Sequence, residues 1–159
     1  MNFVKYCIYS DIYLNEKFKG KLSSLVLRGA LWILDRYTNV VNKALEKSDR
    51  FDKEISIQEA AKKTSRFISI GHQSGEGWFL MGEMIDFIEE GVPNIVCVQP
   101  FGCLPNHITG KGMIKRLKEE YENVNITPID YDPAYSEVNQ LNRIKLMLSV
   151  AKKNLKKSS

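Results

Sequence analysis

The second half of the chain alternates segments that predict strands with segments that predict helices, and this order constrains the fold more than any other feature. Short runs rich in β-branched and other apolar residues predict strands at 67–70, 94–99 and 124–129. Helical spacing of apolar residues follows each run, at 76–90, 110–121 and 136–153. A β-α-β-α-β-α order predicts an α/β fold in which helices cover both faces of a parallel sheet.

The chain before residue 64 predicts helices instead. Apolar residues recur at helical spacing from Leu22 to Leu45, and an aromatic-rich stretch at 2–14 predicts a further short helix. Ser56, with Glu59 three residues later, predicts a capping box that opens a helix through Lys63. We therefore expect three parts: a helical segment that packs on the lobe, the α/β lobe itself and a basic flexible tail, at 1–64, 65–150 and 151–159.

Charge and cysteine content limit the partners and the compartment. The formal net charge is +4, and four lysines of the tail account for all of it: Lys152, Lys153, Lys156 and Lys157. We interpret them as the solvated end of a helix, where lysine complements the helix dipole. The rest of the chain shows no basic patch with interleaved aromatic residues, so we expect no nucleic-acid binding. Three cysteines, no long apolar run and no apolar leader predict a reduced, cytoplasmic protein without a membrane segment.

Function is expected in the loops that follow the strands, because parallel sheets bind ligands at the carboxyl ends of their strands. The first loop, 71–77, is rich in glycine and leads into a predicted helix, an arrangement that suits an anion. Its spacing matches neither the dinucleotide fingerprint nor the P-loop, and Glu76 would repel a phosphate. The alternative is that the glycines only permit a tight turn.

The second loop, 99–112, places Cys103 at its apex between two prolines. A thiolate there could act as a nucleophile with His107 as its base, or ligate a metal. Zinc would find Cys103 and His107, with His72 as a third candidate, and an iron–sulfur cluster needs more cysteines than the loop supplies. An inert loop cysteine is the remaining alternative.

The third loop carries Asp130 and Asp132, which could hold a hard cation or satisfy loop amides. The helix after it presents Asn139, Asn142 and Arg143 on one face, either for a ligand or as a solvated surface.

Several of these motifs together resemble a known family. The resemblance is to the C-terminal part of the long fused activase/dehydratase proteins of anaerobic bacteria, in the 2-hydroxyacyl-CoA (2-hydroxyglutaryl-CoA) dehydratase and benzoyl-CoA reductase group. It covers 71–148, and 6–63 resembles the helical segment before it. The matching runs are GEGWFL (75–80), QPFGCLPNH (99–107), GKG (110–112), DYDP (130–133) and SEVNQLNRIKL (136–146).

The resemblance implies a three-layer Rossmann- or flavodoxin-like lobe that contributes to a 4Fe–4S or double-cubane cluster. Cys103 is then one cluster ligand, shared with a lobe outside this chain. An ATPase activator would donate one electron at low potential, which the cluster passes to an acyl-CoA. The residues implied to line the site or touch substrate are Gly75, Glu76, Gly77, Gln99, Asn106, His107, Asn139, Asn142 and Arg143.

The chain also departs from the family pattern, because the glycine motifs of the activator and the cysteines of the preceding lobe are absent. We therefore expect a C-terminal piece that is inactive and lacks the cluster when alone. Its expected partners are the missing N-terminal lobes or a partner subunit, an acyl-CoA, and a second copy that covers an exposed face. The alternatives are a CoA-binding, anion-binding or docking lobe without a cluster, and a Cys-His hydrolase or acyltransferase.

Overall fold

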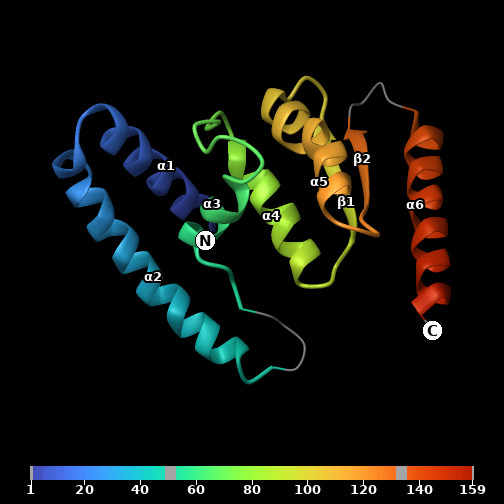
Figure 1. Cartoon of the computed structure of the whole chain (residues 1–159), viewed down its shortest axis with the longest axis horizontal. Helices are drawn as coiled ribbons and strands as arrows, with labels where there is room; N and C mark the ends of the chain where they lie inside the picture. The colour runs from blue at the N-terminus through green and yellow to red at the C-terminus, as the bar shows by residue number, and fades with distance from the viewer. Residues whose placement is uncertain (1, 49–52, 132–135, 159) are drawn as a thin grey trace. The chain divides into compact units, whose positions relative to one another are not determined.

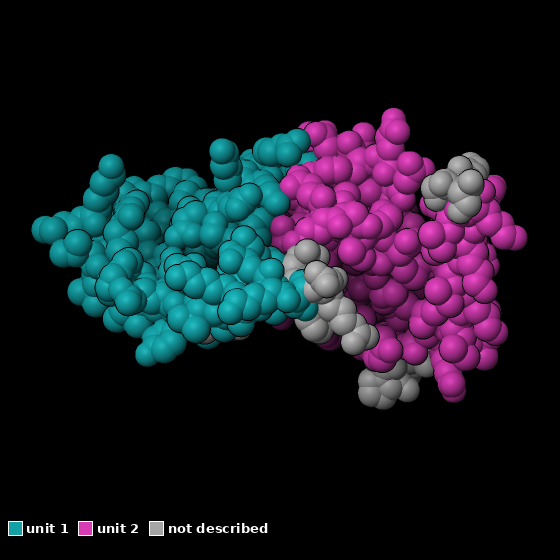
Figure 2. Space-filling view, turned by 90° about the horizontal axis from the view of Figure 1, so that it is seen from below, with its two compact units in different colours: residues 1–73 teal, residues 74–159 magenta. Residues whose placement is uncertain are grey.

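The computed structural model describes residues 2–48, 53–131 and 136–158. The chain forms two compact units, residues 1–73 and 74–159 (Figure 2). The division comes later than the boundary expected at residue 64. Figure 1 labels the elements of each unit.

The first unit is helical. Its elements are α1 (Asn2–Phe18), the 3-10 turn η1 (Lys21–Ser24), α2 (Leu25–Leu45) and α3 (Ile57–Thr64). Helix α1 packs against both α2 and α3. Apolar side chains from all three helices are buried: Tyr6, Ile12, Leu31, Ile57, Ala60 and Ala61. Helix α1 is longer than expected, and η1 interrupts the predicted helix 22–45 at its start.

The predicted start of α3 is confirmed. Ser56 has an extended backbone, and its hydroxyl oxygen accepts a hydrogen bond of 3.2 Å from the main-chain N–H of Glu59. This bond satisfies one of the main-chain N–H groups in the first turn, which have no partner within the helix.

The strand predicted at 67–70 is wrong. The N–H groups of Phe67 and Ile68 both donate to the carbonyl of Thr64, at 2.9 and 3.1 Å, so the chain leaves α3 in turns. Ser69 continues the turn by accepting from the N–H of His72. A strand needs a partner edge for its backbone groups, and here turns take those groups instead.

The second unit combines two parallel strands with helices. Its elements are α4 (Gly77–Glu89), β1 (Asn94–Pro100), η2 (Asn106–Gly110), η3 (Lys111–Met113), α5 (Ile114–Glu120), β2 (Asn125–Tyr131) and α6 (Glu137–Ser158). In Figure 1, α4 lies on one side of the strands and α6 on the other. The α/β character and the parallel pairing are therefore as predicted. The described residues form a two-stranded sheet, so the larger Rossmann-like arrangement is not shown.

One face of the sheet carries the core of this unit. Residues of β1 alternate strictly, with Ile95, Cys97 and Gln99 buried and Val96 and Val98 exposed. The buried partners on the helices and on β2 are mostly large and apolar: Trp78, Phe79, Met81, Met84, Ile85, Leu117, Ile126 and Ile129.

Side chains of α6 cover the outer edge of β2. The guanidinium of Arg143 donates to the carbonyl of Pro128 at 3.0 Å, and the Gln140 amide donates to the carbonyl of Asp130 at 2.9 Å. Pro128 has no N–H to offer a further strand, which suits an edge position. The sheet therefore ends at β2.

The predicted helix 110–121 forms only as a 3-10 turn and the short helix α5, and a π-helical turn precedes them. Close packing accompanies the break, since a Cβ on Gly112 would lie 3.0 Å from the carbonyl oxygen of His107. The predicted final helix is longer than expected, because α6 runs to Ser158 through the segment expected to be a flexible tail. No helix in the described ranges is both long and apolar enough to cross a bilayer.

Candidate functional site at the carboxyl end of the sheet

The two strands bring buried polar groups together at their carboxyl ends. Gln99 of β1 and Asp130 of β2 are partners in the parallel register, and both side chains are buried, with 0% and 7% exposure. One oxygen of each side chain, Oε1 of Gln99 and Oδ1 of Asp130, has no hydrogen-bond partner among the described residues. The second oxygen of Asp130 lies 3.6 Å from the ammonium group of Lys111.

A chain of hydrogen bonds connects Gln99 to Cys103. The Gln99 amide donates to the main-chain carbonyl of Asn106 at 2.9 Å. The Asn106 side-chain amide donates in turn to Cys103 Sγ at 3.1 Å. Because Gln99 is fixed in the strand, it fixes the turn from which Asn106 reaches the sulfur.

The main chain holds the loop around Cys103 at both ends. The Cys103 N–H donates to the carbonyl of Pro100, and its carbonyl accepts from the N–H of His107, both at 3.1 Å. The Cys103 side chain is partly exposed. The loop therefore holds Cys103 in a fixed, partly exposed position.

The glycine loop reaches the same place through Gly75. This residue has a left-handed backbone, φ +58°, and a Cβ there would lie 3.0 Å from Cγ of Pro105. The first two loops therefore lie close together at Gly75 and Pro105. Residues 71–73 belong to the other unit, which includes His72.

The start of α4 does not resemble a phosphate site. Glu76 is the N-cap residue, and its side chain makes no capping hydrogen bond. Burial, and then the neighbouring carboxylates of Glu76 and Asp86, raise the pKa of Glu83 one to two turns later. Acidic groups next to the helix start offset the attraction of its dipole for an anion.

The other cysteines differ clearly from Cys103. Burial raises the pKa of the Cys97 thiol, and the hydrogen bond from Gln99 only partly opposes this. Cys97 is therefore a neutral core residue, as its strand position predicts. Cys7 is exposed on α1 of the other unit.

His107 is near Cys103 in the chain, but the structure does not form the predicted Cys-His pair. The hydrogen bond to Sγ comes from Asn106, and no bond between the sulfur and the His107 ring is found in the described ranges. Among the residues that the structure describes, no three His, Cys, Asp or Glu side chains gather into a metal site. This part of the chain thus offers Cys103 as a single ligand.

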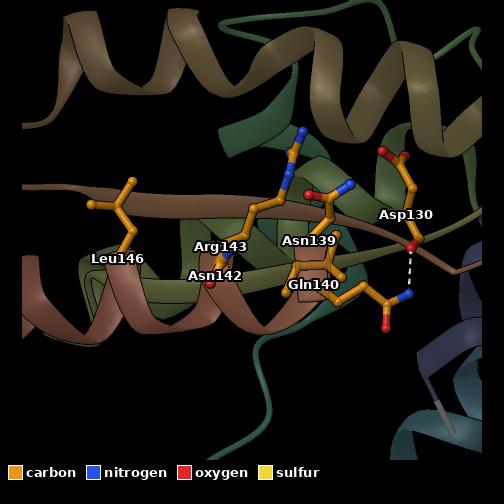
Figure 3. A pocket seen from close by; sticks show the side chains of 7 residues that line it. Asp130, Asn139, Gln140, Asn142, Arg143 and Leu146 are labelled. Atoms are coloured by element: carbon orange, nitrogen blue, oxygen red, sulfur yellow. Dashed lines mark hydrogen bonds between the residues drawn. The ribbon is translucent and has the colours of Figure 1, made fainter. Parts of the chain in front are cut away.

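The predicted polar face of α6 borders a groove along β2 (Figure 3). The groove has a volume of about 340 Å³. Its lining residues are Ile129, Asp130, Asn139, Gln140, Asn142, Arg143 and Leu146. In Figure 3 the Asp130 carboxylate points away from Gln140, which binds the main-chain oxygen of Asp130. Asn139, Asn142 and Arg143 therefore line one groove, and Cys103 is not among its lining residues. Asp132 lies outside the described residues.

Sequence reasoning missed Lys111 and Gln140. Lys111 lies in the Gly-Lys-Gly run, where a lone cation near a strand end was a usable signal. No sequence pattern indicates Gln140, because its hydrogen bond to the Asp130 carbonyl depends on how α6 lies along β2.

Comparison with known proteins finds no matching family model, no matching curated protein and no matching solved structure. The family resemblance of the sequence motifs accordingly stays a prediction.

Proposed function

We propose that the second unit is a cytoplasmic lobe of an iron–sulfur protein of the 2-hydroxyacyl-CoA dehydratase type. In this proposal Cys103 supplies one thiolate ligand to a 4Fe–4S or double-cubane cluster, and lobes or a subunit outside the chain supply the others. The observation that supports it best is the hydrogen bond of 3.1 Å from the Asn106 amide to Cys103 Sγ.

Cys103 suits one position in such a cluster. Cys103 is partly exposed and held by the loop, whereas the chain's other cysteines lie in the core or on the other unit. No three candidate metal ligands gather among the described residues, so in this proposal the remaining ligands come from outside the chain.

The residues around Cys103 have definite tasks in this proposal. Asn106 donates to the ligand sulfur, and hydrogen bonds to the sulfurs are one of the factors that set the reduction potential of a cluster. Gln99 orients Asn106 through its carbonyl. When bound, the cluster would supply low-potential electron transfer to an acyl-CoA.

The larger fold is part of the same proposal. In the described ranges β1 pairs only with β2, so its other edge carries no strand. A strand from the partner lobe that added to this edge would extend the sheet toward a three-layer Rossmann-like lobe.

The alternative lobe, which would bind CoA or another anion without a cluster, has weaker support. The carboxylates near the start of α4 disfavour phosphate. The unpartnered oxygens of Gln99 and Asp130 can only accept hydrogen bonds, so they cannot donate to an anion. The hydrolase alternative has weaker support, because the hydrogen bond to the sulfur comes from Asn106, whose amide cannot act as a base.

The test is anaerobic transfer of a synthetic 4Fe–4S cluster, whose small thiolate caps take the place of the ligands that the chain alone does not supply. The Cys7→Ser variant removes the other exposed thiol and serves as the starting protein. We expect it to retain the visible absorption of the cluster after desalting, and Cys7→Ser/Cys97→Ser to behave in the same way. Equal retention by Cys7→Ser/Cys103→Ser would refute Cys103 as the ligand.

A further inference from the structure

Helix α2 presents an apolar seam to solvent. Six apolar residues alternate at spacings of four and three: Val26, Ala30, Ile33, Tyr37, Val40 and Ala44. This spacing places them on one narrow line along the helix. The four largest side chains are well exposed, at 84% for Val26, 51% for Ile33, 64% for Tyr37 and 69% for Val40.

A different face of α2 already serves the core of the first unit. Its buried side chains are Leu31 and Thr38, with Ser24 just before the helix. Lys5 of α1 is buried and forms an ion pair of 2.8 Å with Asp35 on that side. Because α1 holds this face, α2 cannot turn its seam inward, and the exposed seam is a second, unpartnered surface.

The charge beside the seam is positive on one edge. Gly29, Arg36 and Lys43 lie along that edge at intervals of seven residues, and Arg36 and Lys43 carry the positive charge. The opposite edge is apolar, with Leu27, Leu34 and Val41. The single acidic residue of α2, Asp35, is already paired with Lys5. A partner that fits this surface must therefore bring its own negative charge.

We propose that the α2 seam docks an amphipathic partner helix that carries acidic residues beside its own apolar seam. Three-four spacing is the pattern by which helices interlock, and acidic residues along the partner's edge would meet Arg36 and Lys43. The small residues Ala30 and Ala44 allow a close approach of the two backbones. This proposal uses only the first unit and is independent of the role of Cys103.

A second copy of the chain fits this charge pattern less well. In an antiparallel pair the two cationic edges would face each other, and like charges repel. In a parallel pair the cationic edge would face Leu27, Leu34 and Val41, which offer no charge. Neither arrangement gives Arg36 or Lys43 an acidic partner.

The test uses two designed peptides of four heptads, with leucine and isoleucine in the seam. One peptide has glutamate at the flanking positions and the other has lysine. We expect the full chain to bind the glutamate peptide, followed by anisotropy of a labelled peptide, at least tenfold more tightly than the lysine peptide. Ile33→Asp should weaken binding of the glutamate peptide at least tenfold. Leu25→Asp is the matched control, since Leu25 is exposed on the same helix but off the seam, and it should bind as the unmodified chain does.

Charge reversal distinguishes this proposal from non-specific hydrophobic binding. The double variant Arg36→Glu/Lys43→Glu should reverse the preference, so that the lysine peptide binds more tightly. Equal binding of both peptides, or no binding of either, would overturn the proposal. Two other outcomes would also overturn it: a dimer in light scattering that Ile33→Asp dissolves, or binding to phosphatidylcholine/phosphatidylserine vesicles that Ile33→Asp abolishes while the glutamate peptide does not bind.

Discussion

The ion pair between Lys5 and Asp35 is asymmetric, and this asymmetry gives a sharp prediction for stability. The Lys5 side chain is 2% exposed, whereas the Asp35 side chain is 34% exposed. Lys5 Nζ lies 2.8 Å from Asp35 Oδ1. Removing one partner of a buried pair costs about 3–5 kcal/mol when the other charge stays buried. Removing the partner that is buried leaves a charge that water can reach.

Asp35→Ala should therefore be the costly change. It leaves the Lys5 ammonium buried, and the better helix propensity of alanine offsets only about 0.5 kcal/mol. We expect a loss of about 2–4 kcal/mol in the free energy of unfolding. Lys5→Met keeps the volume and leaves a hydrated Asp35, so the loss should stay below about 1 kcal/mol.

Urea denaturation of both variants, followed by circular dichroism, measures the two values by linear extrapolation. The double variant Lys5→Met/Asp35→Ala completes the cycle and should be more stable than Asp35→Ala alone. Equal losses in the two single variants, or a larger loss in Lys5→Met, would refute the argument from burial.

Three further predictions concern local features. Ser56→Ala removes the cap of α3 and should cost about 1 kcal/mol in urea denaturation, whereas Ser56→Asp, which keeps a capping oxygen, should cost far less. Gly75→Ala adds a Cβ at φ +58° and 3.0 Å from Cγ of Pro105, so the midpoint of thermal unfolding should fall by several degrees; an unchanged midpoint would mean that the loop moves freely. Burial raises the pKa of Cys97, so iodoacetamide should alkylate Cys97 more slowly than a small free thiol at pH 8.5 in the folded chain and at an ordinary rate in urea.

The parts of the fold that depend on local chemistry could be predicted from the sequence. The cap at Ser56 needs only a hydroxyl three residues before the Glu59 N–H. The end of α4 at Gly91 is equally local, since its φ of +83° suits glycine. The strand at 94–100 follows from a run of β-branched residues.

The strand expected at 67–70 failed for a non-local reason. Phe67 and Ile68 have the composition of a strand, but composition does not provide an edge to pair with. The carbonyl of Thr64 takes both of their N–H groups, so turns form instead. No single-sequence pattern indicates which of these competing bonds forms.

The candidate site was predicted in its parts but not in its connections. Strand ends and the loop prolines pointed to Cys103, and the helical spacing grouped Asn139 with Arg143. The bond from Asn106 to Cys103 Sγ and the pairing of Gln99 with Asp130 depend on the turn of η2 and on the sheet register. These are tertiary properties, and sequence spacing gives no access to them.

The most direct test of the central claim, that Cys103 is a cluster ligand, is a mass-spectrometric footprint of the three cysteines. The intact chain is mixed anaerobically with the thiolate-capped 4Fe–4S cluster and then treated with iodoacetamide before digestion. We predict that the cluster protects Cys103 from alkylation, and that it protects the exposed Cys7 much less. Alkylation of Cys103 at the same rate with and without the cluster would contradict the proposal.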